Sequence, residues 1–179
     1  REKIGLFKPF DYLLDMVELP ESIARINSSF CVAEQIISGR QCTLEGYVRN
    51  NQVHTYGVID SIREHNRTTF SRYQYPSRLP AEIQRQMSEI SKKIMLHIGF
   101  DHSAFNLEFF WDEKRDKIWF LEINTRIPQS HSDLFMKVDG ASNHQIMLDI
   151  ALNRDPCFPQ RQGKFRVAGK FFLRQYQDK

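Results

Sequence analysis

Two glutamates and one asparagine stand out in a stretch that is otherwise strongly apolar. Glu108 lies within the segment 104–111, Glu122 lies within the segment 117–123, and Asn124 follows directly. The charged residues DEKRD between the two segments are typical of a turn, so the segments predict a β-hairpin. Side chains alternate between the two faces of a strand, and the apolar faces should pair. The two carboxyl groups and the amide are therefore predicted to converge on one face.

The same alternation assigns the other side chains of the returning strand. Ile118 and Phe120 are predicted to share the face of Glu122 and Asn124. The opposite face is predicted to be wholly apolar and to carry Trp119, Leu121 and Ile123. The first strand is predicted to send its aromatic rings to the core, at Phe105, Phe109 and Trp111. An RNA-binding sheet, which would need those rings exposed, is disfavoured.

Facing carboxylates repel each other unless a positive charge lies between them. Mg²⁺ prefers hard oxygen ligands and usually takes one or two carboxylates together with substrate phosphates. Glu108, Glu122 and Asn124 would supply such ligands. Arg126 lies two residues beyond Asn124, where a guanidinium could bind phosphate oxygens. The alternative is that the carboxylates form the solvated face of an antiparallel strand, which has the same alternation.

Several further elements are needed to position this hairpin. Three strands that form an antiparallel meander are predicted at residues 31–37, 41–48 and 53–59. Residues 63–78 have no clean hydrophobic period and predict a long loop that closes over a site. A short strand at residues 4–8 and a helix that begins at Pro20 are predicted upstream.

Two helices and a last strand are predicted on either side of the hairpin. The first helix begins near Pro80 and ends before Gly99. Its apolar residues recur at helical spacing at Ile83, Met87, Ile90 and Ile94. The second helix is predicted at residues 143–152, and the segment VAGKFFLR at 167–174 predicts the strand.

The composition excludes several classes of protein. No apolar run approaches the roughly 20 residues of a membrane helix. The net charge is only +3 and the basic residues are dispersed, unlike those of a nucleic-acid binder. The three cysteines lack CxxC spacing, which disfavours a disulfide framework or a zinc site and favours the cytoplasm. Because the chain begins with Arg1 and not Met, we expect it to begin inside a longer polypeptide.

The order of these motifs resembles the ATP-grasp superfamily. The segments EFFW and LEINTRIP resemble its metal-binding hairpin, in which a Glu on one strand is followed by E-x-N-x-R on the next. Upstream, VAEQIISGRQ resembles the adenine hinge strand and TLEGYV resembles the strand that follows it. The helix that ends in IGF and the helix within GASNHQIMLDIAL occupy the expected places. The resemblance covers residues 31–155.

The resemblance implies a role for each matching residue. Glu108 and Glu122 would bridge Mg²⁺ ions, with Mn²⁺ as an alternative, and Asn124 would complete the shell. Arg126 would stabilise the transferring phosphoryl group and the acyl phosphate. The residues implied to bind ATP are Lys8 at the phosphates, Gln41 at the ribose, and Glu34, Gln35, Ile37 and Phe110 around the adenine. Lys8 is equally well explained as an exposed lysine beside a turn proline.

The implied fold class is α+β. The chain would be an ATP-grasp carboxy-terminal subdomain, with an antiparallel sheet flanked by helices, and would be a fragment of a larger enzyme. Residues 31–179 would form this catalytic subdomain and residues 1–30 a remnant of the central subdomain. The implied activity is ATP-dependent joining of an amino-acid or peptide-type carboxylate to an amine through an acyl phosphate. The expected partners are these small molecules, with no nucleic acid, no membrane, and a homodimer left open.

Other ATP-grasp activities remain as alternatives. The segment NTRIPQSH also resembles biotin carboxylase, in which a Glu directly precedes the His. Ser130 occupies that position here, so the carboxylate that would deprotonate bicarbonate is missing and the ligase is favoured. Glu45, Ser130 and His131 are candidates to face the acceptor substrate, although each is also typical of a structural polar residue. A carbamoyl-phosphate-type enzyme and a non-catalytic nucleotide-binding module are the remaining alternatives.

Overall fold

The computed structural model describes residues 16, 18, 20–21, 33–64 and 69–174 of the chain. Contacts divide the chain into two units, Arg1–Ile36 and Ile37–Lys179. The strand predicted at 31–37 is wrong over its described part, because residues 33–38 have no regular structure. Strand pairing begins only at Arg40, and an apolar run without a hydrogen-bonded neighbour does not form a strand. The elements predicted at 4–8 and after Pro20 lie outside the described residues, as does Lys8.

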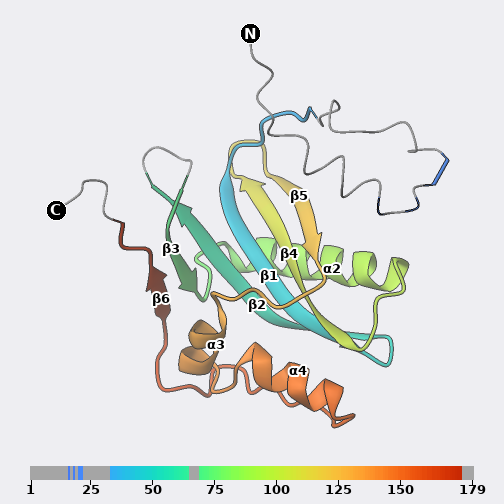
Figure 1. The fold of residues 1–179 in the computed structure, drawn as a ribbon. Coiled ribbons are helices and arrows are strands. Elements are labelled where there is room, and N and C mark those ends of the chain that lie inside the picture. Colours follow the sequence, from blue (N-terminus) through green and yellow to red (C-terminus); the bar gives the residue numbers. More distant parts are fainter. Residues whose placement is uncertain (1–15, 17, 19, 22–32, 65–68, 175–179) are drawn as a thin grey trace. The chain divides into compact units, whose positions relative to one another are not determined.

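The second unit is built on one six-stranded antiparallel sheet (Figure 1). The strands in chain order are β1 (Arg40–Arg49), β2 (Gln52–Arg63), β3 (Phe70–Tyr75), β4 (Ser103–Asp112), β5 (Lys117–Asn124) and β6 (Ala168–Phe171). Across the sheet they follow the order β5-β4-β1-β2-β3-β6. The predicted strands that became β1, β2, β4, β5 and β6 are confirmed, and so is the antiparallel α+β architecture flanked by helices.

Strand β3 lies inside the segment that was predicted to be a loop. It pairs with β2 along Asp60 to Arg63, which extends β2 beyond its predicted end. The core-facing positions of β3 are held by tyrosines, with Tyr75 only 1% exposed. Tyrosine is a strong β-former that buries its ring while it carries a polar group, so a count of aliphatic residues alone misses this strand.

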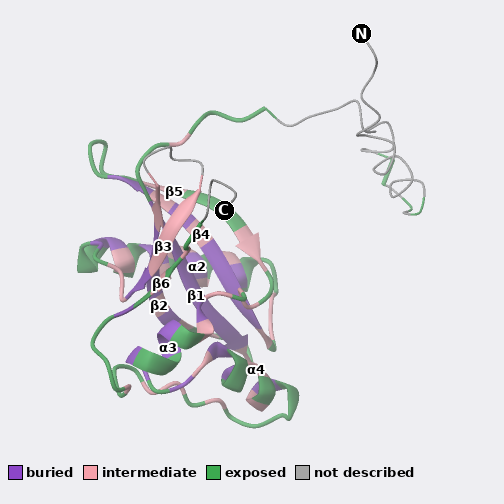
Figure 2. Ribbon diagram, turned by 60° about the vertical axis from the view of Figure 1, so that its left-hand side comes forward, coloured by how far each residue is buried: buried purple, intermediate pink, exposed green. Residues whose placement is uncertain are grey.

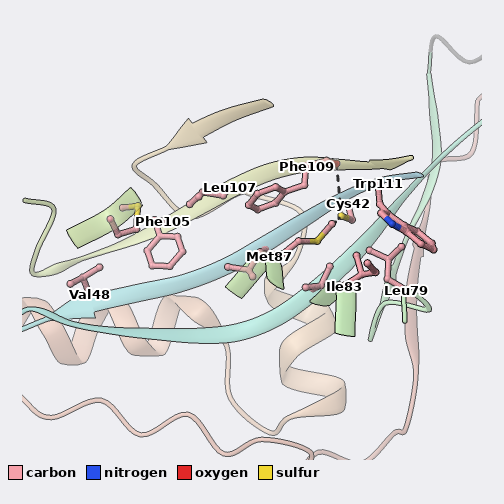
Figure 3. Packing of buried hydrophobic residues seen from close by; sticks show 12 residues of the cluster. Cys42, Val48, Leu79, Ile83, Met87, Phe105, Leu107, Phe109 and Trp111 are labelled. Carbon is pink, nitrogen blue, oxygen red and sulfur yellow. Dashed lines mark hydrogen bonds between the residues drawn. The ribbon is translucent and has the colours of Figure 1, made fainter. Parts of the chain in front are cut away.

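Helix α2 (Ala81–His97) covers one face of the sheet. Figure 3 shows Met87 facing Cys42 of β1, with Phe105, Leu107 and Phe109 of β4 extending along the same cluster. Met87 is fully buried, and its sulfur lies 3.6 Å from the sulfur of Cys42. This helix has the predicted position, and burial of its apolar stripe against the sheet holds the two layers together.

The opposite face is covered at one end by α3 (Ser132–Val138) and α4 (Asn143–Ala151) (Figure 1). Phe135 of α3 is fully buried and makes edge-on ring contacts with Tyr56, Tyr75 and Phe158. Helix α4 was predicted, whereas α3 was not, because seven residues are too few to establish a helical period. The purple segments in Figure 2 follow this division, with burial along β1 and β4 and on the inner sides of the helices. Within the described residues, the helices are too short or too polar to span a bilayer.

A bulge in β5 changes which side chains face the core. Glu108 pairs with Glu122, but the next pair is Phe109 with Phe120, so Leu121 is left without an opposite residue. The prediction that Ile118 and Phe120 share the face of Glu122 is therefore wrong. Both lie on the core side, where Phe120 packs edge-on against Phe109 with the ring centroids 5.7 Å apart. Strict alternation fails because a bulge shifts the side-chain period by one residue.

Candidate active site

The predicted convergence of two carboxyl groups and an amide is present at the edge of the sheet. Glu108 of β4 and Glu122 of β5 are direct cross-strand partners, and Asn124 is the partner of Asn106. The Asn124 amide donates to Glu122 Oε1 at 2.9 Å and to Asn106 Oδ1 at 3.3 Å. Arg126 donates to Asn124 Oδ1 at 3.4 Å. A connected cluster thus holds the three predicted metal ligands together with Arg126, the residue predicted to stabilise the transferring phosphoryl group.

The carboxyl pair has the electrostatic character of a cation site. Burial raises the pKa of Glu108, and the nearby Glu122 raises it further through its charge and a hydrogen bond. A divalent cation between them would favour the ionised form of Glu108 and offset the repulsion between the two carboxylates. Across the described residues, no three His, Cys, Asp or Glu side chains gather, so a metal here would need the Asn124 oxygen as well as the carboxylates. This hard oxygen set suits Mg²⁺.

Gln41 orients Glu108 from the neighbouring strand β1. Its Nε2 donates to Glu108 Oε2 at 2.9 Å, and its Oε1 accepts from the Arg63 guanidinium at 2.7 and 3.0 Å. Arg63 in turn lies over the Phe70 ring, 4.3 Å from its centroid. Because both ends of the Gln41 amide are engaged and the residue is 7% exposed, a ribose contact by Gln41 stays a prediction that would require one of these bonds to be exchanged.

Glu45 lies beneath the site and is completely buried. Its Oε1 bonds to Nδ1 of His131, and its Oε2 accepts from Nδ2 of Asn143 at 3.0 Å. Ser132 donates to Asn143 Oδ1 at 2.6 Å. The carboxylate therefore ties strand β1 to the starts of α3 and α4. Its hydrogen bond to His131 links it to the lining of the pocket described next.

A pocket of about 530 Å³ opens above these residues, on the part of the sheet face that α3 and α4 leave uncovered. Strands supply one wall, which includes Glu108 and Asn124. The loop between β5 and α3 supplies the other wall, which includes Arg126, Ser130 and His131. Five of the predicted site residues are thus brought together around one cavity, with Glu122 beside it and Glu45 behind it.

The other described residues that were predicted to bind the nucleotide lie in the segment 34–37 and on β4. Glu34 and Gln35 are exposed and belong to the first unit, whereas Ile37 is half-buried at the start of the second. Phe110 pairs with Gln41 on one side and Trp119 on the other, on the same sheet face as Glu108. Their contact with adenine stays a prediction.

Several pocket residues were missed by sequence reasoning. They are Thr43, Ser61, Tyr73 and Asn106. Asn106 and Thr43 could have been found from the sequence. Each lies two residues before an acid of the same strand, Glu108 and Glu45 respectively, and residues two apart in a strand share a face. Both strands were predicted correctly. Ser61 and Tyr73 could not, because they are paired by the β2–β3 ladder, which lies in the segment taken for a loop.

The sheet, its helical cover and the paired carboxylates define a class of protein, the ATP-grasp superfamily. Residues 47–155 match the sequence profile described as the carbamoyl-phosphate synthase L chain, ATP binding domain. The chain belongs to this family.

Solved structures agree with the fold. The biotin carboxylase domain of *Hydrogenobacter thermophilus* 2-oxoglutarate carboxylase, a dimer in complex with MgADP, ADP and bicarbonate, is 25% identical, with a TM-score of 0.57 over 68% of this chain and 26% of its own. *Campylobacter jejuni* biotin carboxylase, in a β,γ-ATP complex, is 19% identical, with a TM-score of 0.60 over 75% of this chain and 28% of its own. *Kluyveromyces lactis* urea carboxylase is 24% identical, with a TM-score of 0.58 over 65% of this chain and 10% of its own. The chain thus spans about a quarter or less of these structures. No curated protein matches it.

Proposed function

We propose that the chain is the catalytic portion of an ATP-dependent ligase that joins a carboxylate to an amine through an acyl phosphate. The observation that carries this proposal is the directly opposed pair Glu108 and Glu122, with Asn124 and Arg126 hydrogen-bonded beside it at the wall of one pocket. Family membership supports the use of ATP.

Each residue of the cluster has a defined task in this proposal. Glu108, Glu122 and Asn124 would hold Mg²⁺, which neutralises phosphate charge when it is bound. Arg126 is exposed beside Asn124 and would stabilise the charge that develops on the transferring phosphoryl group. Gln41 and Arg63 would keep Glu108 in its orientation. No protein nucleophile is required, since the substrate carboxylate itself attacks the γ-phosphate of ATP. The protein would accelerate this step by holding the carboxylate and the γ-phosphate in the right geometry.

The nucleotide contacts of this proposal are those that the resemblance to the ATP-grasp superfamily implies. Lys8, Glu34, Gln35, Ile37 and Phe110 are the proposed ATP contacts, and Gln41 is a further one at the ribose. The same proposal assigns residues 31–179 to the catalytic subdomain and residues 1–30 to a remnant of the central subdomain. The rest of the cleft would come from further chain, as the lengths of the solved relatives indicate.

An amine acceptor is favoured over bicarbonate because the pocket lacks a spare carboxylate. Of its described lining residues, Glu108 is the only acid, and it is engaged with Gln41 and Glu122. Ser130 lines the pocket at the position where the biotin carboxylase motif has a Glu. A hydroxyl group is too weak a base to deprotonate bicarbonate. An amino acid is the proposed substrate, as carboxylate or as amine.

The test is ATP-dependent phosphate release by the full-length protein across a panel of amino acids and small carboxylates, with and without bicarbonate. We expect release that requires both a carboxylate and an amine. Glu122→Gln should lower it by about 100-fold or more, because a metal ligand is lost. The matched control is Glu113→Gln, at an exposed acid in the turn of the same hairpin, which should change nothing. Release with bicarbonate alone would instead identify a carboxylase. MgATP binding without release would identify a non-catalytic module.

A further inference from the structure

The pocket contains a buried acid–imidazole pair that the proposed phosphoryl transfer does not use. Glu45 is 0% exposed and His131 is 3% exposed. The two are bonded through Glu45 Oε1 and His131 Nδ1, and Asn143 fixes the second carboxylate oxygen. Burying an acid at this depth is costly unless its oxygens are satisfied. The network therefore holds the imidazole ring of His131 in one orientation.

The contact with Glu45 bears on the tautomer of the imidazole. When the Glu45 carboxylate is ionised it can only accept hydrogen bonds, and Nδ1 of His131 then carries the proton. In the neutral ring, Nε2 is then an acceptor with a lone pair. Within the described part of the chain, Nε2 is buried and has no hydrogen-bond partner. Most buried polar atoms in folded proteins are paired with protein or with water, so this atom can accept a hydrogen bond from a water molecule or from a bound group.

The position of His131 indicates where that partner lies. His131 lines the same pocket as Asn124 and Arg126, and the Tyr73 ring packs edge-on against its imidazole with centroids 4.6 Å apart. A group bound in the pocket beside the phosphate-binding cluster would therefore be next to His131. A histidine with a purely structural role would be expected to use both ring nitrogens within the protein.

We propose that His131 is the general base that accepts a proton from the amine substrate, and that Glu45 and Asn143 are its positioning residues. This inference rests on the proposed ligase function. The amine nitrogen attacks the acyl carbon and forms the C–N bond, and its N–H proton passes to Nε2 of His131. The C–O bond to phosphate breaks, and phosphate leaves with the bonding electrons. Glu45 stabilises the imidazolium that results.

Two nucleophiles separate this step from phosphoryl transfer in the full-length protein. Hydroxylamine is an uncharged, reactive nucleophile at neutral pH and traps an acyl phosphate as a hydroxamate without base catalysis by the protein. An amino-acid amine is largely a cation at that pH and reacts only after a base has accepted a proton from it. His131→Asn keeps a donor near the Nδ1 position and removes Nε2. We expect amide formation by this variant to fall by about 10²- to 10⁴-fold. Hydroxamate formation should fall far less.

Glu45→Gln is the second variant, and it leaves His131 in place. A Gln side chain can donate to Nδ1, which would move the ring proton to Nε2 and abolish its basicity, as in the Ser-His-Asp triad. We expect the same selective loss of amide formation. His144→Asn, at an exposed position of α4, is the control and should leave both reactions unchanged.

The outcomes distinguish the two proposals. A wild-type protein that forms neither hydroxamate nor amide overturns the ligase function itself. A wild-type protein that forms both, with variants that keep amide formation or lose both products equally, overturns the role of His131 while the ligase stands. Thermal melting of each variant accompanies the assays. If His131→Asn melts below the assay temperature, Glu45→Gln decides the question by the same ratio of amide to hydroxamate.

Discussion

The side chains of Glu108 and Glu122 meet across two strands even though like charges repel. Such an arrangement lowers the stability of the fold when both are ionised. Such a pair in a sheet that is otherwise well packed is typical of a functional site, where residues are retained for chemistry although they lower the stability of the fold. The neighbouring Gln41 and Asn124 relieve part of the repulsion by donating to one carboxylate each.

The raised pKa of Glu108 gives a pH-dependent stability. The folded state holds this proton to a higher pH than the unfolded state, so the folded state binds more protons between the two pKa values. Stability without divalent cations should therefore fall as pH rises from the ordinary Glu range through the raised pKa of Glu108. The urea midpoint measured against pH in a chelator would show this slope.

Glu108→Gln should flatten that part of the profile, because it removes the titrating group, while Glu113→Gln should keep it. Added Mg²⁺ should restore stability at the higher pH in the wild type and in Glu113→Gln, but not in Glu108→Gln, by about 2.7 kcal/mol at 100 times its dissociation constant. An unchanged slope in Glu108→Gln would show that other groups control it.

Among the elements, helix α2 provides the clearest test of the core. Met87 is 0% exposed between the helix and strand β1, whereas Leu96 of the same helix is 50% exposed. Met87→Ala should lower the free energy of unfolding by about 2–5 kcal/mol, because it removes buried methylenes and leaves a cavity. Leu96→Ala should change it by no more than about 0.5 kcal/mol. Denaturant unfolding of both variants measures the difference, and equal effects would refute the assigned packing.

The elements differ in how well the sequence specifies them. Helix α2 and the β4–β5 hairpin follow from local patterns, since the helical spacing of Ile83 and Met87 and the alternation around Glu108 need no knowledge of the rest of the chain. Strand β3 and the bulge at Leu121 depend on pairing with distant strands, and local pattern does not contain that information. The same applies to the site. The residues Glu108, Glu122, Asn124 and Arg126 were assigned from the hairpin, but the link from Glu45 to Asn143 spans residues far apart in sequence.

At the scale of the whole second unit, its two described cysteines should differ in their reactivity towards a thiol reagent. Cys42 is buried in the core, and burial together with the charge of Asp60 raises its pKa to about 12. Cys157 is exposed. In the native protein, a thiol reagent should modify Cys157 readily and Cys42 only when the unit unfolds, since the thiolate is the reactive form. Peptide mapping by mass spectrometry would separate the two sites. Comparable native labelling of both would show that the core opens locally.

The two walls of the pocket come from different kinds of structure, strands on one side and a connecting loop on the other. The proposed metal ligands lie on strands of the sheet, whereas Arg126, Ser130 and His131 come from one short connection between β5 and α3. That connection can vary in sequence and length without disturbing the hydrogen-bonded ladders beneath it. Exchange of the part of this segment that follows Arg126 is therefore a short route, in evolution or in the laboratory, to new acceptor specificity while the proposed metal and phosphate residues stay in place.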